Sequence, residues 1–141
     1  MVEINNLTFY YRERKPIFEN VSFEMKNGIY GLLGENGVGK TTLLRIISGL
    51  CFPKKGSCQV LGTERALRNP DMLKQVYYLP EEFIVPSQTV KSFVKLNSVF
   101  YPNFSKEQFN SYLNDFHLDI DSRMKELSFG QKKKVLIAFA I

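Results

Sequence analysis

Residues 34–42 read GENGVGKTT, and the first eight of them fit the pattern G-x-x-x-x-G-K-[ST]. The apolar run IYGLL at 29–33 precedes them and predicts a short buried strand. Apolar residues at helical spacing follow and predict a helix that Gly49 ends: Leu43, Ile46, Ile47 and Leu50. A strand, this loop and a helix form the setting in which backbone N–H groups surround phosphate oxygens. The stretch therefore predicts an α/β fold built around a phosphate-binding loop.

Each residue type in this loop has a chemical reason. Glycines at 34, 37 and 39 allow φ values that side chains disfavour, so the backbone can turn its N–H groups inward. Lys40 would bring a full charge to the β- and γ-phosphates, and the Thr41 hydroxyl is a suitable ligand for Mg²⁺. The structural alternative is a glycine-rich turn with a surface lysine, which gives no reason for Lys and Thr at a helix start. We expect nucleotide contacts from Asn36, Gly37, Gly39, Lys40, Thr41 and Thr42.

The composition is that of a globular chain. Its 141 residues are 44% hydrophobic and 23% charged, which excludes disordered, collagen-like and coiled-coil classes. Cys51 and Cys58 do not have a zinc spacing, so we expect free thiols in a reducing compartment. No apolar stretch approaches the roughly 20 residues that span a bilayer, and no signal peptide opens the chain, so we expect a soluble, cytoplasmic protein. The net charge of +5 fits an anionic ligand or a mildly basic surface, and no nucleic-acid partner is expected.

The hydrophobic pattern divides the chain into two parts. Alternating or short apolar runs predict strands at 2–11, 21–25, 29–33, 57–61 and 76–79. We expect the first two to pair across a turn at 12–16, and Asn69-Pro70 to open a short helix through Gln75. After Pro86 the period becomes 3.6 and predicts helices at 90–100 and 105–116 and a third from 128. We therefore expect a nucleotide-binding core at 1–85, with its phosphate loop at 34–42, and a helical subdomain at 86–141.

A second motif lies at Leu127 to Gln131, which reads LSFGQ and is followed by three lysines. Ser128-x-x-Gln131 is a capping box that opens a helix, as Ser105-x-x-Gln108 does earlier. The positive end of the helix dipole points outward here, and Lys132 to Lys134 oppose that dipole unless an anion lies nearby. The alternative interpretation is an ordinary capping box at a solvated helix start.

With both motifs in this order, the sequence resembles the ATP-binding cassette (ABC) ATPases, whose signature typically reads LSGGQ before basic residues and an apolar helix. The resemblance covers the whole chain. It implies a P-loop NTPase core with an antiparallel β subdomain and an inserted helical subdomain, incomplete at the C-terminus. It also implies ATP and Mg²⁺ as cofactors and a head-to-tail dimer, in which Ser128, Gly130 and Gln131 act on the nucleotide of the partner subunit.

The resemblance assigns roles to two residues outside the motifs. Tyr11 stands about where the family places an aromatic that stacks on adenine, although Tyr10 or Phe9 could be the stacking residue and strand packing is the alternative. Glu81 stands where the family usually has a glutamine that touches Mg²⁺ and the attacking water; the alternative is a solvated loop acid. The candidates are then Lys40 and Glu81 for catalysis, Thr41 and Glu81 for the metal, and 80–86 as the hinge reporting nucleotide state.

Two residues depart from the family pattern. Phe129 replaces the first glycine of the signature, and its ring could either weaken closure on ATP or point into the helical subdomain. His117 precedes the signature, whereas the family's switch histidine follows it. We therefore expect His117 at a loop or helix end without a catalytic role.

The function implied is ATP binding, and in the complete subunit ATP hydrolysis, to power an ABC transporter at the inner face of the cell membrane through transmembrane permease subunits. The apolar run VLIAFAI at 135–141 is expected to belong to the signature helix, before the family's Walker B Asp and catalytic Glu. We therefore expect no turnover from residues 1–141 alone. The alternatives are a soluble ABC-type ATPase acting on the ribosome or DNA, and a non-catalytic nucleotide-binding module.

Overall fold

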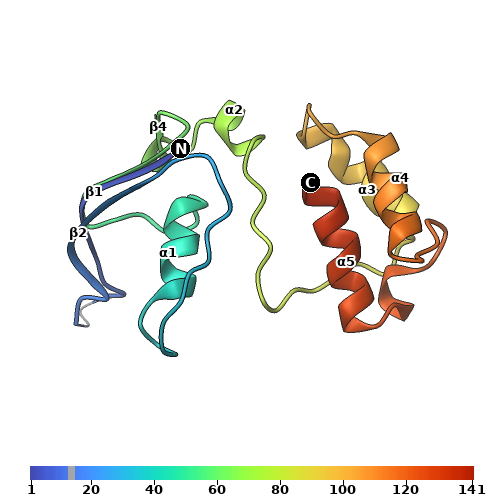
Figure 1. The fold of residues 1–141 in the computed structure, drawn as a ribbon, viewed down its shortest axis with the longest axis horizontal. Helices are drawn as coiled ribbons and strands as arrows, with labels where there is room; N and C mark the ends of the chain where they lie inside the picture. The colour runs from blue at the N-terminus through green and yellow to red at the C-terminus, as the bar shows by residue number, and fades with distance from the viewer. Residues whose placement is uncertain (13–14) are drawn as a thin grey trace. The chain divides into compact units, whose positions relative to one another are not determined.

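The structure is a computed structural model that describes residues 1–12 and 15–141, in two compact units (Figure 1). The first unit is Met1–Tyr78 and the second is Leu79–Ile141. Part of the turn predicted at 12–16, residues 13–14, lies outside the described residues. The predicted division at residues 85 and 86 into a core and a helical subdomain stays a prediction.

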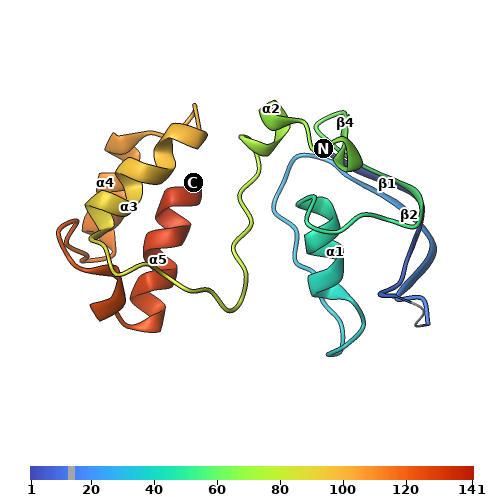
Figure 2. The ribbon, with the colours of Figure 1, turned by 180° about the vertical axis from the view of Figure 1, so that it is seen from behind.

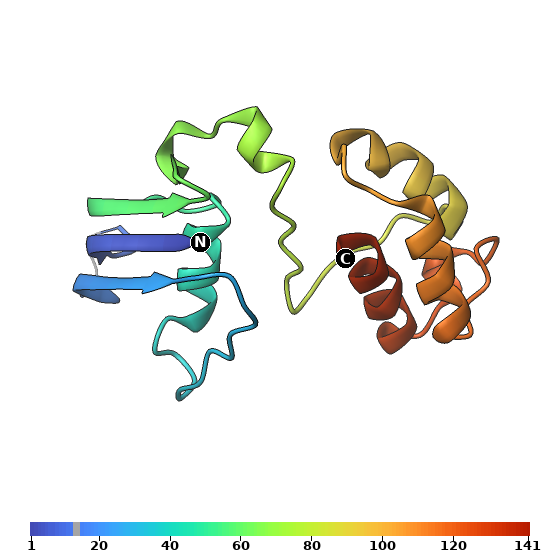
Figure 3. The ribbon, with the colours of Figure 1, turned by 45° about the horizontal axis from the view of Figure 1, so that its top comes forward.

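The first unit is built on an antiparallel sheet in the order β2-β1-β3-β4 (Figure 3). Its strands are β1 (Val2–Phe9), β2 (Phe18–Met25), β3 (Lys55–Val60) and β4 (Thr63–Glu64). The predicted pairing of the first two strands is confirmed, and Ile4 pairs with Phe23 on one side and Cys58 on the other. The register of β1 shifts between Ile4 and Leu7, so that Ile4, Leu7 and Phe9 all pack against the helix after the phosphate loop. That core consists of Ile4, Leu7, Phe9, Leu43, Ile46 and Cys58.

Two predicted strands are not strands in the structure. Residues 29–33 and 76–79 have no regular secondary structure, and the side chains of Ile29 and Leu33 are 104% and 93% exposed. The apolar pattern is that of a buried strand, but a strand forms only where neighbours take up its N–H and C=O groups. Among the described residues, the sheet ends at β2 and β4, and no strand pairs with either run. The predictions were wrong because an apolar pattern indicates that a segment tends to be buried. It does not indicate whether a neighbouring strand is available to form hydrogen bonds with that segment.

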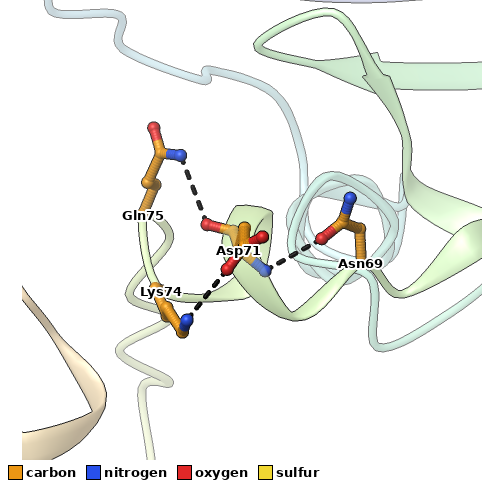
Figure 4. Close-up of polar contacts among 4 residues, drawn as sticks. All are labelled: Asn69, Asp71, Lys74 and Gln75. Atoms are coloured by element: carbon orange, nitrogen blue, oxygen red, sulfur yellow. Dashed lines mark hydrogen bonds and ion pairs between the residues drawn. The ribbon is translucent and has the colours of Figure 1, made fainter.

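The helix α1 (Lys40–Ile47) confirms the pattern that follows the phosphate loop. A short helix, α2 (Pro70–Leu73), confirms the one predicted to begin at Asn69-Pro70. Figure 4 shows its cap: Asn69 Oδ1 accepts from the Asp71 backbone N–H at 2.9 Å, and Lys74 Nζ lies 2.8 Å from Asp71 Oδ1. Proline suits the first helical turn because its missing N–H would have no intrahelical partner there. The 3₁₀ turn η1 (Arg65–Leu67) precedes it.

The second unit contains the helices α3, α4 and α5 (Figure 2). They are α3 (Val90–Asn97), continued by the 3₁₀ turn η2 (Ser98–Phe100); α4 (Lys106–Asp115); and α5 (Phe129–Ala140), preceded by the turn η3 (Met124–Glu126). The Phe139 ring of α5 lies 5.4 Å from that of Phe93 and 5.0 Å from that of Phe104, measured between centroids. The predicted helices are therefore confirmed. None of the helices within residues 1–12 and 15–141 has both the length and the hydropathy of a membrane-spanning helix.

Candidate functional site

The phosphate loop leads directly into α1, with Gly39 as the N-cap residue at φ 102°. A Cβ atom on Gly39 would lie 2.5 Å from Ile17 Cγ2 and 2.9 Å from Phe18 Cζ. Glycine is therefore required both for its left-handed φ and for the close approach of the start of β2. The Leu43 N–H donates to the Gly39 carbonyl at 2.8 Å and closes the first turn. The first unit thus fixes where the helix begins and leaves residues 34–38 exposed.

Lys40 folds its ammonium group back across this loop. Its Nζ donates to the carbonyl oxygens of Gly34 and Glu35, each at 2.7 Å. The first turn of α1 carries no acidic residue, so the positive charge adds to the positive end of the helix dipole. Exposed loop N–H groups, a helix N-terminus and an ammonium group are the donors that suit a phosphate chain. The residues present therefore fit the phosphates of a nucleotide.

The two threonines after Lys40 differ in environment. Thr41 is exposed, whereas Thr42 is buried at 7% exposure. An exposed hydroxyl beside bound phosphates can still ligate Mg²⁺, a cation that usually keeps several waters and takes few protein ligands. The described residues contain no group of three or more His, Cys, Asp or Glu side chains that could hold a metal ion by themselves. Ligation of Mg²⁺ by Thr41 stays a prediction.

Tyr11 reaches α1 from the end of β1. Its hydroxyl lies 3.4 Å from Thr42 Oγ1 and 3.9 Å from Cys51 Sγ, and its ring packs edge-on against Phe9 at 4.9 Å. Hydrogen bonds with the hydroxyls of Tyr11 and Tyr78 raise the pKa of the Arg45 guanidinium above its usual value. Sequence analysis did not single out Arg45, because the helical period relates it only to Thr42, one turn earlier, and not to Tyr11 or Tyr78.

The three aromatics at the end of β1 therefore occupy different places. Phe9 is buried in the core at 5% exposure, and the Tyr10 ring lies under Lys54 Nζ at 5.7 Å. Tyr11 is 37% exposed and stands beside the phosphate-loop helix. Of the three, only Tyr11 combines an accessible ring with a contact to that helix, although its stacking on adenine stays a prediction.

The signature motif forms the start of α5, and its predicted capping box is present. The Gln131 N–H donates to Ser128 Oγ at 3.3 Å, and the Ser128 N–H donates to Gln131 Oε1 at 2.9 Å. A Cβ on Gly130 would meet nothing within 4 Å, so the surface beside it is open. Ser128 and Gly130 therefore present an open helix N-terminus. The side-chain oxygen of Gln131 already accepts a hydrogen bond in the cap.

Glu81 and Phe129 lie in the second unit, and the phosphate loop lies in the first. Glu81 is exposed on a bend at the start of that unit, and its predicted contact with Mg²⁺ stays a prediction. The Phe129 ring stacks on Phe83, a residue that sequence analysis did not single out. His117, at φ 54°, follows the end of α4, where its N–H donates to the Asn114 carbonyl at 3.0 Å.

Known proteins similar to this chain share its motifs and fold. A family model described as ABC transporter matches residues 18–141. The zinc import ATP-binding protein ZnuC of Ehrlichia chaffeensis is 34% identical over 144 residues, which cover 98% of this chain and 54% of that protein. A solved ATP-binding subunit of an ABC transporter superposes with a TM-score of 0.86 at 27% identity, over 99% of this chain and 60% of that one.

A third similarity concerns the fold alone. The ATP-binding cassette MJ0796, solved as a dimer in a post-hydrolysis state with ADP and Pi, superposes with a TM-score of 0.77 at 24% identity, over 100% of this chain and 69% of that one. This chain spans about half the length of the curated relative described above. Its fold is that of an ABC-type P-loop cassette, of which the described residues form a part. The chain belongs to the ABC transporter family.

Proposed function

We propose that this chain is the ATP-binding part of a subunit that hydrolyses ATP to power an ABC transporter. The observation that carries the proposal is the phosphate loop, in which Lys40, the glycine-rich backbone and the N-terminus of α1 converge without any acidic residue in the first turn. The match of residues 18–141 to the ABC transporter family supports ATP as the nucleotide and transport as the purpose.

In this proposal the loop holds the triphosphate and Lys40 exchanges its two carbonyl partners for β- and γ-phosphate oxygens. Charge-assisted bonds of this kind are stronger than those to neutral carbonyls. Asn36, Gly37, Gly39 and Thr42 complete the loop, Thr41 ligates Mg²⁺, and Tyr11 stacks its exposed ring on the adenine. Glu81 acts at the metal and the attacking water.

The signature acts across a dimer in this proposal. Ser128 and Gly130 form an open helix N-terminus that can meet the γ-phosphate held by the partner subunit, and the side-chain NH₂ group of Gln131 remains for the same role. A dimer is also found for the structurally similar cassette MJ0796. Transmembrane permease subunits are the proposed partners, at the inner face of the membrane. Residues 1–141 alone bind nucleotide without turnover.

Calorimetric titration of the intact protein with ATP and Mg²⁺ tests the proposal. Lys40→Ala should weaken ATP binding roughly 100-fold, since the ammonium forms hydrogen bonds to charged phosphate oxygens, and should abolish turnover. Lys55→Ala is the matched control, because Lys55 is an exposed lysine of the same unit at the start of β3. Equal ATP affinity of the Lys40 variant and the control would contradict the proposal.

A further inference from the structure

Phe129 is the first residue of α5 and stands within the signature. The capping box fixes the backbone on both sides of it, through the reciprocal bonds of Ser128 and Gln131. Its side chain is nonetheless 56% exposed, so core packing does not dictate the position of the ring. The position of the ring must therefore depend on specific contacts with neighbouring side chains.

The ring is held by two neighbours. Its centroid lies 5.3 Å from that of Phe83, with the planes inclined by 20°, which is a stacked pair. Lys133, one helical turn further along α5, places its Nζ 5.4 Å from the same centroid. The Phe129 ring therefore contacts two residues of its own chain, Phe83 and Lys133.

Phe83 belongs to segment 80–86, which has no regular secondary structure, includes the exposed bend at Glu81, and precedes the N-cap of α3 at Thr89. Such a segment has few internal contacts to fix it. Two residues of chain span at most about 7 Å, so a fixed Phe83 also confines Glu81 to the neighbourhood of the start of α5. The acidic side chain of Glu81 is electrostatically favourable there, because the helix start is positively charged.

We propose that Phe129 is a positioning residue, which with Phe83 tethers segment 80–86 to the start of the signature helix of the same chain. This inference rests on the proposed function, since it couples Glu81, proposed to respond to the nucleotide, to the motif proposed to act on the partner's nucleotide. The bulky Phe129 ring packs against Phe83, and the surface beside Gly130 remains open.

Hydrogen–deuterium exchange on the intact, nucleotide-free protein tests the tether directly. Phe129→Ala and Phe83→Leu should each speed the exchange of the amides of residues 81–86 by roughly twofold to tenfold, the effect expected from loss of one aromatic pair. The double variant should be no faster than either single variant, because both remove the same contact. Phe129→Tyr should restore slow exchange, since it keeps the ring.

Phe100→Ala is the matched control, because Phe100 is also exposed, at 64%, and lies in η2 of the same unit. It should leave exchange at 81–86 unchanged. Additive effects of Phe129→Ala and Phe83→Leu, or unchanged exchange in both, would overturn the tether. Because this readout needs no nucleotide, it can succeed even if ATP fails to bind and the proposed function falls.

Steady-state kinetics of the same variants distinguish a Phe129 ring that positions segment 80–86 from a ring that obstructs closure on ATP. In the intact subunit, Phe129→Ala should lower kcat roughly twofold to tenfold and leave the calorimetric Kd for ATP within about twofold, because the phosphate loop belongs to the other unit. A rise in kcat on replacing Phe129 by alanine or glycine would show that the ring obstructs closure, and would refute the positioning role.

Discussion

Replacement of Arg65 by methionine should stabilise the protein. Arg65 is 0% exposed, and its Nε, Nη1 and Nη2 atoms have no hydrogen-bond partner among the described residues. Burial lowers the pKa of this guanidinium below its usual value, which is the expected response of an unpaired cation. Methionine keeps the aliphatic stem and removes the charged head.

The magnitude follows from three opposing effects. An unpaired buried polar group costs about 1–3 kcal/mol, so the guanidinium as a whole costs about 3 kcal/mol or more. Against this, its removal leaves a small cavity worth about 1 kcal/mol. It also removes a cation from the C-terminal end of α1, where a Cβ on Gly49 would lie 2.9 Å from Nη2; that attraction is worth about 0.5–1 kcal/mol. The net expectation is a gain of about 1–2 kcal/mol in the free energy of unfolding.

Urea and thermal unfolding of the intact protein, followed by circular dichroism, measure this gain. For a unit of this size, Tm should rise by roughly 4–8 °C per kcal/mol. Arg68→Met is the matched control, because Arg68 is an exposed arginine at the end of the same turn, and it should change stability by less than about 0.5 kcal/mol. A loss of about 1 kcal/mol or more in the Arg65 variant would refute the reasoning, since it would show that the guanidinium has a partner.

Two further predictions concern the stability of the protein. Gly39→Ala should destabilise the protein by about 2 kcal/mol or more in urea unfolding, because the new Cβ would meet Ile17 at 2.5 Å at a φ of 102°. Gly130→Ala, within α5 and with open space around it, should instead be neutral or stabilise by up to about 1 kcal/mol; similar losses in both variants would contradict this. Burial raises the pKa of the Cys58 thiol from 9.0 to about 11, so the folded state holds its proton where the unfolded chain releases it. Stability should therefore fall between about pH 9 and 11, by up to about 1.4 kcal/mol per pH unit more in the wild type than in Cys58→Ala; equal pH slopes would count against it.

Local signals predicted most of the elements that carry the site. The phosphate-loop glycines, the caps at Asn69 and Ser128, and the 3.6-residue periods each depend on residues within one or two turns, and the structure confirms them. The strands at 29–33 and 76–79 failed for the opposite reason, because their formation depends on hydrogen-bonding neighbours elsewhere in the fold.

Patterns within the sequence were sufficient to predict a phosphate loop with Lys40, a capped signature helix and the family to which both point. Those features are local, since a glycine turn or a capping box needs only adjacent residues. Which side chains meet depends on the tertiary structure: Tyr11 contacts Thr42, Phe129 contacts Phe83, and the buried guanidinium of Arg65 has no hydrogen-bond partner among the described residues. Contacts between residues far apart in the chain depend on how strands and helices pack, and no short-range pattern encodes that packing.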